Sequence, residues 1–169
     1  MPDQRTIRKA EQDKREGKSP STQAGEFVRE EMDEIRRGEH GARSTRQAIA
    51  IGLSKARRAG VKLKPPRKGQ VKRRTRKSAE YAYAVGQGKR KARRRPRVSR
   101  AVTHVLKREP RRAASRDALS RHAKRASAGR SASARATAAR KAVRTKGAAR
   151  RSAAARKAAR TARANAVRM

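Results

Sequence analysis

Apolar residues near the start of the chain recur at helical spacing. Between residues 19 and 38 one stripe repeats at i, i+3 and i+4, formed by Ala24, Phe27, Val28, Met32 and Ile35. Ser19 suits the N-cap, Pro20 the first helical position and Gly38 the end, so this run predicts an amphipathic helix. Its acidic residues are expected to lie on solvated faces, and they are Glu26, Glu30, Glu31, Asp33 and Glu34.

A second amphipathic pattern follows between residues 44 and 60. Ser44 and Gln47 form an S-x-x-Q capping box, and Gly60 suits the end of the helix. One face collects Ala48, Ile49, Gly52, Leu53, Ala56 and Ala59, whereas Arg46, Arg57 and Arg58 are expected to point away from it. Because Gly52 has no side chain, a partner helix can approach closely there. The two patterns predict an αα-hairpin.

A weaker pattern precedes the hairpin. Asp3 can cap a short helix that runs through Glu16 and stops at Gly17. Residues 1–64 are therefore expected to fold as a small helical head, either a hairpin or a three-helix unit. Its few apolar side chains bury little surface, and we expect the head to gain stability by forming a homodimer or by docking on nucleic acid.

The signals weaken after the head. Pro65 and Pro66 interrupt any helix, so residues 65–77 are expected to be a basic linker. Residues 78–127 are expected to hold short basic helices. Two of them could pair as a minor hairpin, through Val98, Ala101, Val102, Val105 and Leu106 on one helix and Ala118, Leu119, Ala123 and Ala126 on the other.

The remaining residues, 128–169, form a low-complexity tail rich in Ala, Arg and Lys. Like charges at i, i+3 and i+4 oppose a helix in water, and phosphates would remove that penalty. We expect a tail that is largely disordered when free and partly helical when bound. The predicted fold class is mainly α, with a helical head, short helices and this basic tail.

The net positive charge of the chain indicates which class of partner it binds. The chain of 169 residues has 52 Lys and Arg against 13 Asp and Glu, which gives a formal charge of +39. Residues 1–65 carry +6 (16 basic, 10 acidic) and residues 66–169 carry +33 (36 basic, 3 acidic). Only 2% of residues are aromatic, so a large core is excluded, and a polyanion such as nucleic acid is the expected partner.

The leading hypothesis is sequence-independent DNA binding and compaction by phosphate neutralisation. The residues expected to contact nucleic acid are the clustered cations of the basic part and of the last turns of the head. They are Arg46, Arg57, Arg58, Lys62, Lys64, Arg67, Lys68, Lys72, Arg73, Arg74, Arg76, Lys77, Lys89, Arg90, Lys91, Arg93, Arg94, Arg95, Arg97, Arg140, Lys141, Arg150, Arg151, Arg156, Lys157 and Arg160.

Two other functions stay open. An RNA-binding or ribosome-associated assembly factor would use the same cations. A protein-interaction or membrane-surface protein is less favoured, because the tail lacks the Leu, Phe and Trp face that membrane insertion requires. The sequence has no Cys, no secretion signal and no apolar run of membrane-spanning length. We expect a cytoplasmic, nucleoid-associated protein.

The sequence gives little support for a metal site, an active site or a motif that reads DNA bases. His40, His104 and His122 lack paired ligand spacing, so we expect surface histidines, no metal and no cofactor. Catalysis needs a dry pocket that so small a core does not provide, and we do not expect an enzyme. The turn of a DNA-reading helix-turn-helix is shorter than residues 38–44, so we favour a plain helical hairpin. Tyr81 and Tyr83 could stack on bases or pack between helices.

Two resemblances accompany these patterns. The tail is similar in composition to the Ala-rich basic tails of linker histones and bacterial histone-like proteins. The run RSTRQAIAIGLSKARRAG resembles a T/S-[RK]-[KQ]-Q-A-I-A-I-[AG]-L-S-x-A-R motif, here from Ser44 to Arg57, of small bacterial proteins of unknown function that are often described as histone-like. This resemblance implies a bacterial setting and association with nucleic acid, and it carries no assigned activity.

Overall fold

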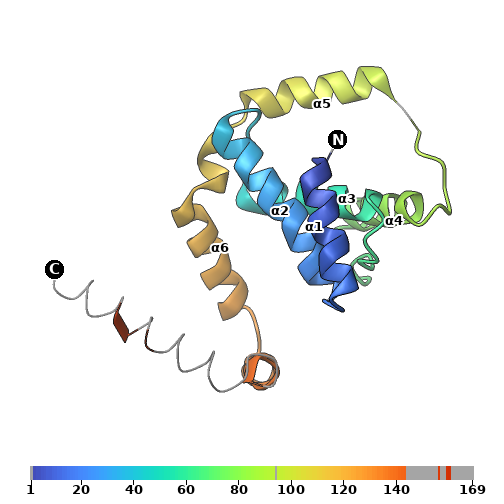
Figure 1. Cartoon of the computed structure of the whole chain (residues 1–169). Coiled ribbons are helices and arrows are strands. Elements are labelled where there is room, and N and C mark those ends of the chain that lie inside the picture. The colour runs from blue at the N-terminus through green and yellow to red at the C-terminus, as the bar shows by residue number, and fades with distance from the viewer. Residues whose placement is uncertain (1, 94, 144–155, 157–158, 161–169) are drawn as a thin grey trace. The chain divides into compact units, whose positions relative to one another are not determined.

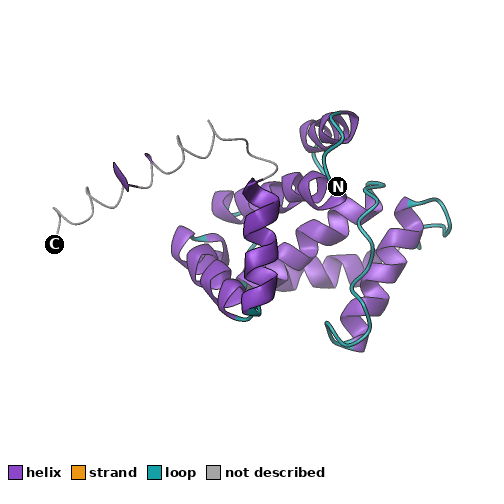
Figure 2. Ribbon diagram, turned by 90° about the horizontal axis from the view of Figure 1, so that it is seen from below, coloured by secondary structure: helices purple, strands orange, loops and turns teal. Residues whose placement is uncertain are grey.

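The computed structural model describes residues 2–93, 95–143, 156 and 159–160 (Figure 1). The chain divides into two compact units, Met1–His122 and Ala123–Met169. In the described part of the chain all regular structure is helical, and loops connect the helices (Figure 2). The expected mainly α fold is confirmed.

The first three helices begin and end where their local signals predict. They are α1 (Gln4–Arg15), α2 (Pro20–Arg37) and α3 (Thr45–Arg58). Asp3, Ser19 and Ser44 each accept a hydrogen bond from a backbone N–H of the first turn, which satisfies a group that the helix itself leaves unpaired. The capping box is altered, because the Gln47 side chain accepts from the N–H of Arg43 rather than of Ser44.

Helices α2 and α3 form the expected hairpin and pack more extensively than any other pair of helices. Gly52 allows this approach, since a Cβ at Gly52 would lie 2.7 Å from the Cα of Val28. Ala59 does not join the buried face as expected; it is the C-cap of α3 and is exposed, because the helix ends one residue before it.

Two apolar clusters lie along the hairpin, one toward its open end and one toward the turn between α2 and α3. One cluster contains Ala10, Ala24, Phe27, Ala56 and Val61, with Ile7, Leu53 and Leu63 packed against it. The other contains Met32, Ile35, Ala42, Ala48, Ala113 and Ala114, with Val28, Ile49 and Leu119 packed against it. Segments of the same chain therefore cover the apolar faces that we expected a second copy to cover. The homodimer through the head stays a prediction.

Helix α4 (Arg73–Gly86) begins inside the expected linker, five residues before the predicted helix start at residue 78. Its buried residues, Ala79 and Ala82, and Gly86 follow helical spacing, and α4 packs on α3. A Cβ at Gly86 would overlap the carbonyl of Arg57, so only glycine permits this contact. Gln87 also donates to the carbonyl of Gly60 at 3.1 Å. This part of the basic sequence is thus docked on the head.

The next elements are α5 (Pro96–Arg108), the short 3-10 helix η1 (Arg111–Ala114) and α6 (Arg116–Ala128). The expected hairpin of α5 with α6 does not form. Instead η1 docks on α2 and α3, where Thr45 donates to the carbonyl of Ala113 at 2.7 Å and Arg36 donates to that of Ala114 at 3.0 Å. These two alanines join the cluster near the turn of the hairpin, and α5 packs on none of the other described helices.

In the second unit, residues 132–143 are helical. Ser131 caps this helix by accepting from the N–H of Ala134 at 3.2 Å. High helix propensity of Ala and Arg together with the Ser cap accounts for the helix. Most of the remaining tail lies outside the described residues, as do four of the predicted contact residues, Arg94, Arg150, Arg151 and Lys157. Among the described residues, no helix is long and apolar enough to cross a membrane.

Candidate nucleic-acid interface

Residues 62–97, here called the basic segment, run from the end of the head through α4 to the first turn of α5. Most of their predicted contact residues are exposed, namely Lys62, Lys64, Arg67, Lys68, Lys72, Arg73, Arg74, Lys77, Lys89, Arg90, Lys91, Arg93, Arg95 and Arg97. Arg46 and Arg58 on α3 are exposed as well. In the second unit the described members, Arg140, Lys141, Arg156 and Arg160, are also exposed.

These cations have few carboxylates to neutralise them. Among the described residues of the basic segment, the one ion pair joins Arg76 to Glu80, and Arg76 is half-buried. In α1 and α2, by contrast, carboxylates contact several of the exposed cations: Lys9 and Arg29 both contact Glu26. The charge of the basic segment is therefore available to a polyanion.

The helix starts in this region add to the positive potential. Lys72 and Arg95 occupy the N-cap positions of α4 and α5, and neither caps its helix with a side-chain hydrogen bond. Unpaired N–H groups and the positive end of the helix dipole meet at each start, next to further arginines such as Arg73 and Arg97. A phosphate at these starts would accept from the free N–H groups and offset the local repulsion.

Tyr81 fastens the loop between α4 and α5. Its hydroxyl accepts from the N–H of Arg93 at 2.9 Å, and the guanidinium of Arg90 lies 5.0 Å from the ring centre. This cation–π contact occupies one face of the ring, so Tyr81 positions loop cations instead of presenting a bare stacking surface. Tyr83 is half-buried.

Arg57 was expected to face solvent with the other α3 arginines, and this expectation is wrong. Arg57 is 6% exposed, and its guanidinium donates to the carbonyls of Leu63 and Leu53 at 3.2 and 3.4 Å. Burial lowers the pKa of Arg57. The side chain holds the segment after α3 against the helix, so it belongs to the packing of the head and not to the interface.

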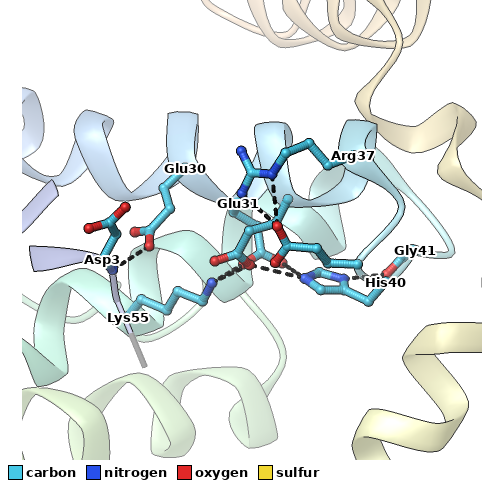
Figure 3. A network of polar contacts seen from close by, with 9 residues as sticks. Asp3, Glu30, Glu31, Arg37, His40, Gly41 and Lys55 are labelled. Atoms are coloured by element: carbon cyan, nitrogen blue, oxygen red, sulfur yellow. Dashed lines mark hydrogen bonds and ion pairs between the residues drawn. The ribbon is translucent and has the colours of Figure 1, made fainter. Parts of the chain in front are cut away.

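A buried charge cluster in the hairpin is the main feature that sequence reasoning missed (Figure 3). The carboxylate of Glu31 is fully buried and lies 2.8 Å from the Lys55 ammonium. Glu34 lies 2.6 Å from the same ammonium and 3.2 Å from Nε2 of His40. The expectation of solvated Glu31 and Glu34 and a surface His40 is therefore wrong. Spacing offered a signal, because Glu31 falls four residues after Phe27 on the apolar stripe.

The pKa directions in this cluster reflect competition between burial and charge. Burial raises the pKa of Glu31 despite its contact with Lys55. Burial also acts to raise the pKa of Glu34, but Lys55 and His40 outweigh it and hold that pKa below its usual value. For Lys55 the order is the same: burial acts to lower its pKa, and the two glutamates raise it on balance. Lys55 is therefore a charged ammonium over the whole physiological range.

One ligand atom from each of Glu31, Glu34 and His40 lies within 4.8 Å of the others, a spacing that could hold a metal ion. Lys55 argues against that use. Its ammonium already contacts both carboxylates and supplies the positive charge that a cation would provide. The cluster is best understood as an ion-pair network that joins α2 to α3 and fixes their register.

Residues 15–69 match a protein family described as a family of unknown function (DUF6496). The match spans α2, α3 and the whole Glu31, Glu34, His40 and Lys55 cluster, and it ends before α4. No curated protein and no solved structure matches the chain.

Proposed function

We propose that this protein binds duplex DNA without sequence preference and compacts it. The observation that carries the proposal is the basic segment, whose exposed cations lack carboxylate partners in the described part of the chain, whereas carboxylates of the head pair with several of its cations. The proposal places the protein on the nucleoid in the bacterial cytoplasm, in keeping with its resemblance to histone-like proteins.

Phosphate neutralisation is the proposed mechanism. Each Lys or Arg that meets a phosphate releases condensed counterions, and this release drives binding at low salt. Arg provides 36 of the 52 cations, and its planar guanidinium can contact two phosphate oxygens at once. The head acts as a folded support, because α4 is docked on α3 while its charged side chains stay exposed.

The packing of α3 supports binding without sequence preference. A recognition helix must present one face to the major groove, whereas α3 packs between α2 and α4. The turn before α3 is also covered, since the N–H groups of Gly41 and Ala42 donate to the carbonyls of Leu106 and Pro110. The proposal therefore does not include a helix-turn-helix that reads bases.

The test compares two full-length variants that lose the same charge from different places. One replaces Arg73, Arg74 and Lys77 of α4 with Gln; the control replaces Lys9, Arg29 and Arg37, which are exposed but paired with carboxylates. Affinity for a duplex is measured by fluorescence anisotropy over a range of salt. The slope of log affinity against log salt should fall by about 0.9 for each phosphate that the α4 variant no longer neutralises, and much less in the control.

Three results would count against the proposal. A wild-type affinity that does not change with salt removes phosphate neutralisation as the mechanism. Equal losses in the two variants remove the basic segment as the interface. Preference for structured RNA over duplex DNA in competition at matched salt would replace the proposal with the RNA-binding alternative.

A further inference from the structure

Helix α5 carries an apolar stripe that no described part of the chain covers. Val98, Val102 and Val105 lie at i, i+4 and i+7 and are 53, 51 and 56% exposed. They are among the most exposed large apolar residues of the described chain. The helix is held at its C-terminal end, where Leu106 is half-buried and its carbonyl accepts from the N–H of Gly41 at 2.8 Å (Figure 1). The stripe is thus presented on a fixed element.

The opposite face of α5 is basic. Helical spacing places Arg100 and Lys107 opposite the valine stripe, and Arg97 and Arg108 on one flank of it. A partner that covers the valines therefore leaves these cations free for phosphates. One helix can engage an apolar partner and a polyanion at the same time.

Charges at the two ends of the stripe are complementary to each other. Arg95 precedes α5 and lies seven residues before Val102, and Glu109 follows α5 and lies seven residues after it. Both flank the same face. Neither makes an ion pair within the part of the chain that the structure describes. In an antiparallel pair of α5 helices centred on Val102, each Arg95 meets the Glu109 of the other copy.

We propose that α5 pairs antiparallel with α5 of a second copy when both copies are bound to nucleic acid. This pairing rests on the proposed function, and it supplies the link between copies that compaction of DNA requires. The interface is isologous, with Val102 facing Val102 on the two-fold axis.

Nucleic acid is needed because the stripe is small and the copies repel. A helix of 13 residues offers much less than the roughly 800 Å² per partner of a stable interface. Each free copy also carries a formal charge of +39. Phosphates neutralise that charge, and a shared duplex raises the effective concentration of one α5 near another. We therefore expect no α5 pairing between free copies.

The test uses single cysteines, because the natural chain contains none. Val102→Cys places a thiol on the proposed axis. Thr103→Cys, one residue later and on a different face, is the matched control. Full-length variants are oxidised with and without a long duplex, at equal numbers of copies bound per length of DNA. Val102→Cys on DNA should give about tenfold more disulfide-linked dimer than either Thr103→Cys on DNA or Val102→Cys without it.

A mixture of Arg95→Cys and Glu109→Cys proteins tests the direction of the pair. Antiparallel helices give linked heterodimers, whereas Arg95→Cys homodimers would overturn the antiparallel arrangement. Equal yields at positions 102 and 103 would overturn the pairing, since crowding on DNA alone explains them. Dimers that form equally without DNA would overturn the dependence on nucleic acid.

Val102→Asn, which is polar but adds no charge, separates pairing from other uses of the stripe. Because Val102 is half exposed, this variant keeps the fold, and its affinity for a short duplex that holds one copy should stay at the wild-type value. A tenfold loss there would show that the stripe contacts DNA itself and would overturn the pairing. If the wild-type chain fails to bind DNA at all, the proposed function fails; normal binding without the linkage at position 102 removes only the pairing.

Discussion

The α1–α3 bundle (residues 3–61) and the basic segment use charge in opposite ways. In the bundle, Lys55 is half-buried between two carboxylates and joins α2 to α3. In the basic segment, cations such as Lys72 and Arg95 stand at helix starts without a cap or a carboxylate partner. Charge stabilises the fold in the first region, whereas in the second it opposes the fold and is left for a ligand.

Helix α4 connects these two uses. Its small residues Ala79, Ala82 and Gly86 are committed to the bundle, while Arg73, Arg74 and Lys77 stay exposed. Stability and nucleic-acid binding are therefore carried by different faces of one helix. Substitutions that act on one property and spare the other can test this separation.

The largest difference is expected from removing one cation in each region. Lys55→Met leaves the buried Glu31 carboxylate without its partner, and losses for such broken pairs are about 3 to 5 kcal/mol in the free energy of unfolding. Lys62→Met, at an exposed position, should change that free energy by less than about 0.5 kcal/mol. Urea unfolding followed by helical circular dichroism measures both. Equal effects would mean that Lys55 is not a structural charge.

Glycine positions give the next largest contrast. Gly52→Ala puts a Cβ 2.7 Å from the Cα of Val28, so overpacking should cost about 1 to 3 kcal/mol of stability. Gly25 is an exposed position of α2 with no atom within 4 Å of a new Cβ, so Gly25→Ala should instead stabilise the fold by about 0.5 to 1 kcal/mol through helix propensity. Thermal unfolding of the two variants decides. A stabilised Gly52→Ala protein would contradict the close approach of α2 and α3.

Local signals account for what the sequence predicted well. Asp3, Ser19 and Ser44 cap their helices as expected, because a cap depends only on residues a few positions away. The helical spacing of apolar residues and the glycines near the helix ends likewise predict the positions of α2 and α3. These interactions join residues that are close in the sequence, so they can be predicted without knowledge of the three-dimensional fold.

Long-range packing explains what the sequence did not predict. The hydrogen bond from Thr45 to the carbonyl of Ala113 joins residues 68 positions apart, and no local sequence pattern predicts it. The rule that carboxylates are usually solvated predicts an exposed Glu31, although its spacing from Phe27 puts it on the apolar stripe. The exposure of the proposed contact cations follows more simply, since cations without nearby acids stay exposed. Arg57 is buried because backbone carbonyls satisfy its guanidinium, and Arg76 is half-buried and paired with Glu80. That these cations contact nucleic acid stays a prediction.

Removing a helix cap from α2 and adding one to α4 tests whether the basic segment is less stable because its helix starts carry cations that bind DNA. Ser19→Ala removes a working cap from α2 and should cost about 1 kcal/mol of stability. Lys72→Ser adds a cap to α4, should add up to about 1 kcal/mol, and should lower the salt slope of DNA binding by about 0.9. Unfolding and anisotropy on the same samples measure both effects. A Lys72→Ser protein with no gain in stability would show that α4 does not lack a cap.

The smallest effect concerns pH and the buried carboxylate. A raised pKa means that folded Glu31 holds its proton more tightly than the unfolded chain does, so its contribution to stability is lost as pH rises through that raised pKa. Glu31→Gln cannot ionise, and its stability relative to the wild type should increase from about pH 4.5 upward and then level off. Asp33→Gln, at a more exposed position on the same helix, is the control. If the Glu31→Gln difference falls with rising pH instead, then Lys55 stabilises the Glu31 charge by more than burial costs, and the contrast between the two regions becomes greater still.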